Sequence, residues 1–167
     1  SAAALVIAHG CLDHQEAYKA IQWDILMLIF GMLAFGMALE NSGAAALLVN
    51  SIAAPLGVFG PLAALAVVYL LTSTMTEVIS NNATAILMTP IAIGLAQTLG
   101  VDPRAFVVAV MFAASASFAT PIGYQTNTLV YTAGGYKFSD FVRIGLPLNL
   151  LFFAVAMLVI PFFWPLT

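Results

Sequence analysis

Charge is the scarcest property of this sequence. Of its 167 residues, only 7% are charged, whereas an ordinary soluble domain has about 25%. So few charges cannot cover a water-facing surface, which excludes a soluble globular domain and a disordered tail. The 4 Lys and Arg residues also exclude a nucleic-acid binder, because such a protein needs a basic face. The single cysteine, Cys11, excludes an internal disulfide and a cysteine-based metal cluster.

Apolar residues, by contrast, are abundant. They make up 63% of the chain, and the mean hydropathy is +1.07, which predicts an all-α polytopic membrane protein. Residues 1–12 are apolar, but they are too short for a span that needs about 20 residues. We therefore interpret the sequence as part of a larger protein, cut inside a membrane helix.

Sequence motifs for enzymes and metal sites are missing. The sequence has no HExxH, GxSxG or phosphate-loop motif, so an enzyme is not supported. His9, Cys11 and His14 have spacing similar to that of metal ligands, but they straddle a predicted helix end and lack acidic partners. No metal site is therefore predicted from these residues, and no cofactor.

Apolar runs bounded by polar residues, Pro and Gly predict the helical segments. Asp13 and Glu16 have capping-box spacing, which predicts a short interfacial helix. The predicted apolar segments are 23–39, the short 44–56, 61–79, 83–99 with a kink at Pro90, 104–118, a remnant at 129–133, and a last span at 140–165.

Polar residues concentrate in two islands, 72–84 and 115–128. Thr72, Thr76 and Ser80 recur every four residues, which places their hydroxyl groups on one helix face. A helix broken inside a membrane persists only where protein or a watery cavity surrounds the break. Two such breaks that meet would offer helix N-termini to an anion and unwound carbonyl groups to a small cation such as sodium. Because no Lys or Arg occurs in the first island, anion binding there must depend on dipoles, amides and bound cations.

Simpler interpretations of these islands remain open. Ser and Thr in membrane helices commonly bond to their own helix or join two helices. Residues 80–82 could be an ordinary turn, since residues 61–80 form about 30 Å of helix, enough to cross a membrane. Glu77 would cost about 2.5–3.5 kcal/mol at the centre of a membrane. It is therefore either functional or a protonated or snorkelling structural acid.

Four strings in these regions resemble the divalent anion:sodium symporter family, within the wider ion transporter superfamily. They are AYKAIQWDILMLIFGMLAFGMALENSG, TEVISNNATAILMTPIA, ATPIGYQTNTLVY and FVRIGLPLN. The resemblance runs from about Ala17 to the end of the chain and is greatest to bacterial permeases with inserted regulatory domains, which are absent here. It implies one inverted-repeat half of a transporter: a re-entrant helical hairpin at 61–99, a broken helix at 104–133 and the last span at 140–165, all in one membrane domain, 1–167.

The resemblance also implies the site residues. The family usually has Ser-Asn-Thr at the hairpin tip, where this chain has Asn82, and it often has proline where this chain has Gln125 and Thr126. By position, the implied sodium ligands are Thr76, the carbonyl of Ile79, Asn81 and the carbonyl of Gly123. The implied anion-binding residues are Ser80, Asn81, Asn82, Tyr124, Gln125 and Thr126. Glu77 receives a structural or coupling role and no ligand role.

The function implied is sodium-coupled symport of small anions such as dicarboxylates or sulfate, in a homodimer with elevator-type motion. The other, N-terminal repeat would be a separate part of the transporter. Lys19, Lys137 and Arg143 predict the cytoplasmic side of a cell membrane, which leaves the C-terminus outside. Two alternatives stay open: a superfamily relative that moves another ion, by arsenite transport or proton-coupled antiport, and a non-transporting membrane subunit.

Overall fold

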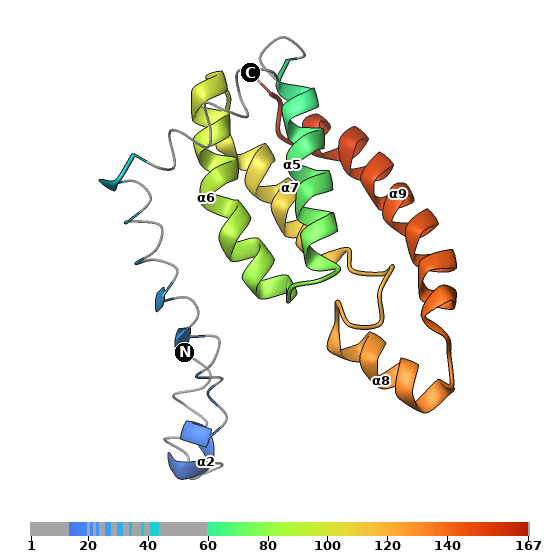
Figure 1. Ribbon diagram of the computed structural model, residues 1–167. Coiled ribbons are helices and arrows are strands. Elements are labelled where there is room, and N and C mark those ends of the chain that lie inside the picture. Colours follow the sequence, from blue (N-terminus) through green and yellow to red (C-terminus); the bar gives the residue numbers. More distant parts are fainter. Residues whose placement is uncertain are drawn as a thin grey trace.

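The computed structural model describes residues 60–166, the short helix α2 (His14–Lys19) and scattered positions between 21 and 43. Within these residues the regular secondary structure is entirely helical, as the all-α prediction requires (Figure 1). The predictions for 1–12, for the Asp13–Glu16 cap, for 44–56 and for most of 23–39 lie outside the described residues, as do His9 and Cys11.

Helices α5 (Pro61–Thr76) and α6 (Asn81–Leu99) run side by side in opposite directions. Four residues, 77–80, connect them. Helix α6 begins earlier than the expected residue 83, because the Ser80 hydroxyl caps it by accepting a hydrogen bond from Ala83 N at 3.3 Å. It ends in a left-handed Gly100 (φ 70°), where Gly100 N and Val101 N donate to the carbonyls of Gln97 and Ala96.

Helix α7 (Pro103–Ser115) starts at a proline, where the missing N–H costs no helical hydrogen bond. Asp102 caps it by accepting from Arg104 N at 2.8 Å. The helix stops at Ser115, three residues before the expected end at 118, and residues 116–124 form an irregular segment, here called the break.

Helix α8 (Gln125–Gly134) and helix α9 (Phe138–Phe163) complete the chain. The sequence interpretation treated 124–128 as part of the break and expected only a remnant at 129–133. This was wrong, because Thr128 N donates to the Tyr124 carbonyl and the helix starts at Gln125. Helix α9 begins two residues before the expected 140, where the Asp140 carboxylate accepts from Lys137 N at 2.8 Å.

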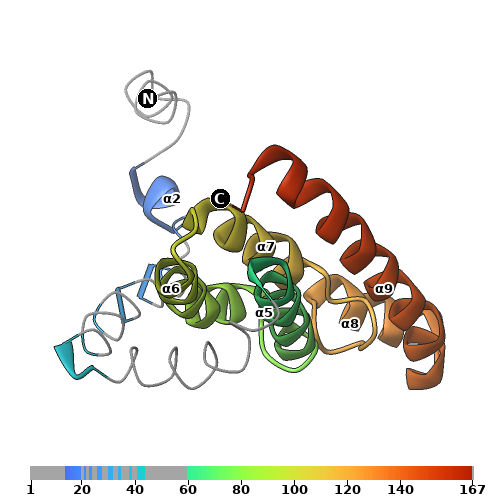
Figure 2. The ribbon, with the colours of Figure 1, turned by 90° about the horizontal axis from the view of Figure 1, so that it is seen from above.

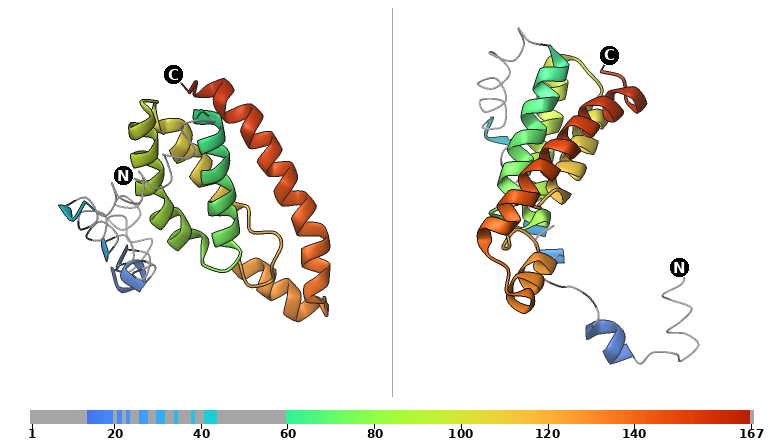
Figure 3. Two further views of the ribbon diagram at one scale, coloured as in Figure 1. Left: turned by 45° about the horizontal axis from the view of Figure 1, so that its top comes forward. Right: turned by 90° about the vertical axis from the view of Figure 1, so that its right-hand side faces the viewer.

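The core lies between α5, α6 and α7, with α9 along one side of α5 and α7 (Figure 2). Small residues at helical spacing let these helices approach closely. The fully buried alanines are Ala64, Ala92, Ala96, Ala105, Ala109 and Ala113. Helix α8 lies apart from this bundle and has no buried residue (Figure 3). The ends of α5 and α7 therefore bring the 77–80 turn and the break to the same end of the bundle.

Two described helices, α6 and α9, are long and apolar enough to cross a membrane. Helices α5 and α7 are apolar but shorter. Most of α9 is exposed in this chain: Gly145, Ala156 and Ile160 are its buried residues. An apolar surface of this extent suits a helix that faces lipid or another part of a membrane protein.

Candidate functional site

The 77–80 turn and the break lie directly against each other. The Ser117 hydroxyl donates to the Thr76 carbonyl at 3.1 Å, and the Thr120 hydroxyl donates to the Glu77 carbonyl at 2.7 Å. Both carbonyls belong to the end of α5, where a helix has no internal partners for them. The break therefore completes the hydrogen bonding of the α5 terminus. The sequence predicts that the two interruptions meet, and these bonds confirm it.

Oxygen atoms converge around the side-chain amide of Asn81. One end of this amide lies 2.8 Å from Thr76 Oγ1, 3.2 Å from the Gly123 carbonyl oxygen and 3.3 Å from the Ala114 carbonyl oxygen. With its nitrogen at this end, the amide donates to these oxygens. With its oxygen there, it accepts from the Thr76 hydroxyl, and four oxygen atoms face one another. The second arrangement suits a cation among them.

Thr76 is fixed in this oxygen cluster by a second bond. Its hydroxyl lies 2.7 Å from the Ala114 carbonyl, and its side chain is fully buried. Thr72, one turn earlier, instead donates to Val68 O of its own helix at 2.7 Å. For Thr72, the simpler interpretation of a membrane threonine is therefore correct, and the predicted hydroxyl stripe reduces to Thr76.

Gly123 is placed where no side chain fits. A Cβ atom there would overlap the Ser117 hydroxyl and would lie 3.0 Å from the Thr76 carbonyl oxygen. Gly123 N donates to Thr120 Oγ1 at 3.1 Å, which leaves its carbonyl directed to the Asn81 amide. The break therefore reaches the oxygen cluster only because residue 123 is a glycine.

Side chains from α8 hold the unwound backbone of the break. The Asn127 amide donates to the carbonyls of Ser117 and Thr120, at 2.8 and 3.1 Å, and the Thr128 hydroxyl donates to the Pro121 carbonyl at 2.7 Å. Unpaired backbone groups are costly in a membrane. These three bonds explain how the break persists without helical structure.

Glu77 joins three elements. Its carboxylate oxygen Oε1 accepts from Phe118 N at 3.1 Å, from Ala119 N at 2.9 Å and from the Asn149 amide of α9 at 2.7 Å. The side chain is 9% exposed. Glu77 is therefore neither snorkelling nor exposed, and it connects the end of α5 to the break and to α9.

The structure places the predicted anion-binding residues at two neighbouring helix starts. Ser80 and Asn82 are exposed at the start of α6, and Tyr124, Gln125 and Thr126 are exposed at the start of α8. Asn81 and Gly123 bring these two starts together. For Ile79, the structure gives a bond from its own N–H to the Met75 carbonyl at 2.9 Å, so a role for its carbonyl stays a prediction.

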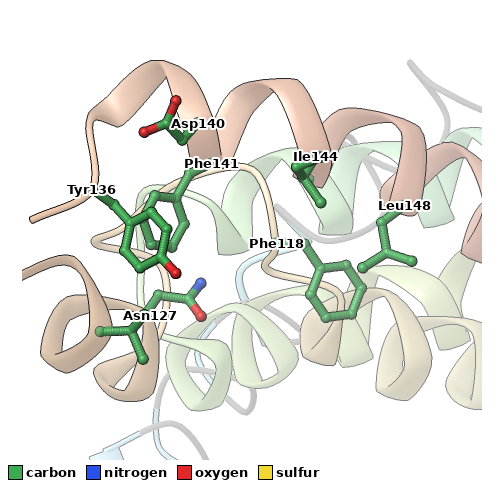
Figure 4. Close-up of a pocket in the computed structure, with 9 residues that line it drawn as sticks. Phe118, Asn127, Tyr136, Asp140, Phe141, Ile144 and Leu148 are labelled. Atoms are coloured by element: carbon green, nitrogen blue, oxygen red, sulfur yellow. The ribbon is translucent and has the colours of Figure 1, made fainter. Parts of the chain in front are cut away.

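A cavity of about 320 Å³ lies between the break, α8 and α9 (Figure 4). Apolar side chains such as Phe118, Phe141, Ile144 and Leu148 form most of its wall, and Tyr136 and Asn127 point into the same region. None of the predicted anion-binding residues lines it. Its apolar wall does not suit an anion, so the cavity and the candidate site are different places.

Three site residues were missed from the sequence: Ala114, Ser117 and Asn149. Ala114 contributes only its carbonyl group, which no side-chain pattern reveals. Asn149 is a polar residue inside the most apolar predicted span and belongs to the string FVRIGLPLN. This polar residue in an apolar span is the sequence feature that points to Asn149.

Comparisons with known proteins identify the family of this chain. A model of the citrate transporter family matches residues 1–111 and 86–165. An uncharacterized transporter of Synechocystis sp. is 51% identical over 89% of this chain and 24% of its own length. Sodium/sulfate cotransporter 1 of Chlamydomonas reinhardtii is 37% identical over 92% of this chain and 18% of its own. Solute carrier family 13 member 2 of Oryctolagus cuniculus is 34% identical over 89% of this chain and 25% of its own length.

The chain thus spans a quarter or less of the length of these three relatives. The match nevertheless covers most of the chain and includes both the 77–80 turn and the break. The resemblance to divalent anion:sodium symporters is confirmed, and the chain belongs to the citrate transporter family of membrane transporters.

Proposed function

We propose that this chain forms the C-terminal repeat of a sodium-coupled symporter for small anions such as dicarboxylates or sulfate. The observation that carries the proposal is the convergence of oxygen atoms from Thr76, Asn81 and Gly123. A sodium ion there would take oxygen ligands from the end of α5, the start of α6 and the break. The name of a Chlamydomonas relative, sodium/sulfate cotransporter 1, supports the same ion and the same class of anion.

Sodium would bind by turning the Asn81 amide. Without the ion, the amide nitrogen satisfies the surrounding oxygens. With the ion, the amide oxygen faces them and the ion replaces the lost hydrogen bonds. The Ile79 carbonyl would complete the set. Ion binding would therefore tie the 77–80 turn to the break.

The anion would bind next to this ion. Ser80, Asn82, Tyr124, Gln125 and Thr126 lie at the starts of α6 and α8, where free N–H groups and the helix dipole favour negative charge. Because sodium adds a positive charge and orders both starts, it would raise the affinity for the anion. The anion must then raise the affinity for sodium by the same factor.

The wider assembly is part of the proposal. In it, α5 and α6 form a re-entrant hairpin, and α7, the break and α8 form a broken helix. The transporter is a homodimer in a cell membrane and includes an N-terminal repeat. Lys19, Lys137 and Arg143 are cytoplasmic, and the C-terminus is outside. The chain acts by transport and not by catalysis.

Thr76→Val in the full-length protein tests the sodium site. The hydroxyl group is lost at nearly constant volume, and we expect the sodium concentration for half-maximal anion uptake into liposomes to rise about tenfold or more, a loss of about 1.4 kcal/mol or more. Thr72→Val, one turn away, is the matched control, since that hydroxyl donates to the Val68 carbonyl of its own helix. If the two variants needed the same sodium concentration for half-maximal uptake, the proposed sodium site at Thr76 would be contradicted.

Replacing sodium by choline in the wild-type assay separates the proposal from its alternatives. Anion uptake that continues unchanged in choline would indicate another coupling ion, such as the proton. No uptake of sulfate or succinate under any gradient would favour a different cargo or a non-transporting subunit.

A further inference from the structure

A buried carboxylate oxygen without a partner lies behind the oxygen cluster. Glu77 Oε1 accepts three hydrogen bonds, but its other oxygen, Oε2, is buried and has no hydrogen-bond partner in the described part of the chain. The residue is 9% exposed. Buried polar atoms are normally paired, so an unpaired one calls for a specific reason.

The partner of Glu77 has the same property. Asn149 donates its amide nitrogen to Glu77 Oε1 at 2.7 Å, yet its oxygen Oδ1 is also buried without a partner among the described residues. The two unpaired atoms therefore sit on two side-chain groups that are already in direct contact. Both oxygen atoms lack a donor, so one proton or one metal ion shared between them would satisfy both.

A cation between these two acceptors would balance the charge of a carboxylate at Glu77. All three N–H donors reach Oε1, so Oε2 is left for another ligand. Neutralisation by a basic side chain is not observed, since the ion pair within the described residues joins Arg104 and Asp102, and Lys137 and Arg143 of the α9 region are exposed. An ionised carboxylate buried without a counter-charge is strongly unfavourable.

We propose that Glu77 Oε2 and Asn149 Oδ1 hold a second sodium ion, separate from the one at Thr76, Asn81 and Gly123. Oxygen ligands from a carboxylate and an amide suit a hard cation, and one positive charge neutralises the buried carboxylate. This ion would bind where α5, the break and α9 meet. The inference rests on the proposed sodium-coupled function and deepens it.

Glu77→Gln is the sharpest variant for a test. Gln retains an oxygen that can accept from Phe118 N, Ala119 N and Asn149, while its new N–H group can donate to Asn149 Oδ1. It therefore keeps the structural bonds, removes the charge and replaces the ion with a hydrogen bond. Asp102→Asn is the matched control: it removes one carboxylate at an exposed helix cap, where Asn caps equally well.

The measurement is the number of sodium ions bound at saturation per protomer of the purified full-length protein, by radioactive sodium binding. We expect Glu77→Gln to bind one sodium ion fewer than the wild type, and Asp102→Asn to bind the same number. A folded Glu77→Gln variant that binds the wild-type number with wild-type affinity would overturn the second site. A wild-type protein that binds no sodium would instead contradict the proposed function itself.

Infrared spectroscopy of the wild type keeps the test independent of the variant's folding. The difference spectrum between sodium and choline should contain a carboxylate band that shifts when sodium binds, and Glu77→Gln should lack it where it folds. A wild-type difference spectrum without any carboxylate band that responds to sodium would overturn the proposal, because the ion would then not bind at the carboxylate.

Discussion

The two sides of the break are held in different ways. On the side of α5 and α6, the break packs against buried residues and donates hydrogen bonds to the end of α5. On the side of α8, its carbonyls are held by Asn127 and Thr128, in a helix without any buried residue. Tight packing thus positions the proposed ion ligands, while polar side chains hold the break next to the start of α8, where the anion is proposed to bind. The proposed cation part of the site is therefore the more densely packed.

Gly123→Ala should have the largest effect on this contrast. The added methyl group would overlap the Ser117 hydroxyl and press on the Thr76 carbonyl, which separates the break from α5. We expect sodium-driven anion uptake by the full-length protein to be lost. Gly134→Ala is the control, because its methyl group would meet the ring of Tyr136, which is 52% exposed and can move away.

The double variant Ser117→Ala, Gly123→Ala sharpens the same point. Removing the hydroxyl removes the closest obstacle, although the Thr76 carbonyl remains. Partial recovery of uptake is expected. No difference between the single and double variants would show that the glycine is needed for another reason.

Asn127→Ala should have an intermediate effect. It leaves the Ser117 and Thr120 carbonyls without the amide that now serves both, at a cost of about 1–3 kcal/mol for each buried acceptor that water cannot reach. The thermal unfolding temperature of the purified protein should fall, and the anion KM should rise more than the sodium requirement. If the sodium concentration for half-maximal uptake rose more than the anion KM, the contrast between the α5–α6 side and the α8 side of the break would be contradicted.

Leu129→Ala should have the smallest effect. Leu129 lies on α8 and is 70% exposed in this chain, so its truncation opens no internal cavity. Uptake and unfolding temperature are expected to stay within about 0.5 kcal/mol of the wild type. A marked loss of uptake would show that another part of the transporter covers this face of α8.

Sequence patterns predicted the parts of the fold that depend on local chemistry. The polar islands revealed both interruptions, but the Ser80 cap was missed, so the start of α6 was expected too late, at residue 83. Helix α8 was misread because Gln125 and Thr126 are polar residues beside a Pro-Gly segment, although they form the first turn of a helix. Polarity in that position reflected a helix start and not continued unwinding.

The candidate site was less accessible from the sequence. Thr76, Asn81 and Gly123 came from resemblance, and the structure brings these three together. Ala114 and the Glu77–Asn149 bond depend on contacts between residues 38 and 72 positions apart. Such contacts are set by how α7 and α9 pack on α5, which one sequence does not specify.

The alanine-lined contacts between α5, α6 and α7 have a consequence for transport. Helices that touch through methyl groups have little room to slide or rotate separately, because side chains cannot adjust to absorb the movement. These three helices should therefore travel as one piece, and the candidate ion ligands at their common end would travel with them. Ala156 and Ile160 of α9 belong to the same core, and Asn149 bonds to Glu77, so α9 would move together with these three helices.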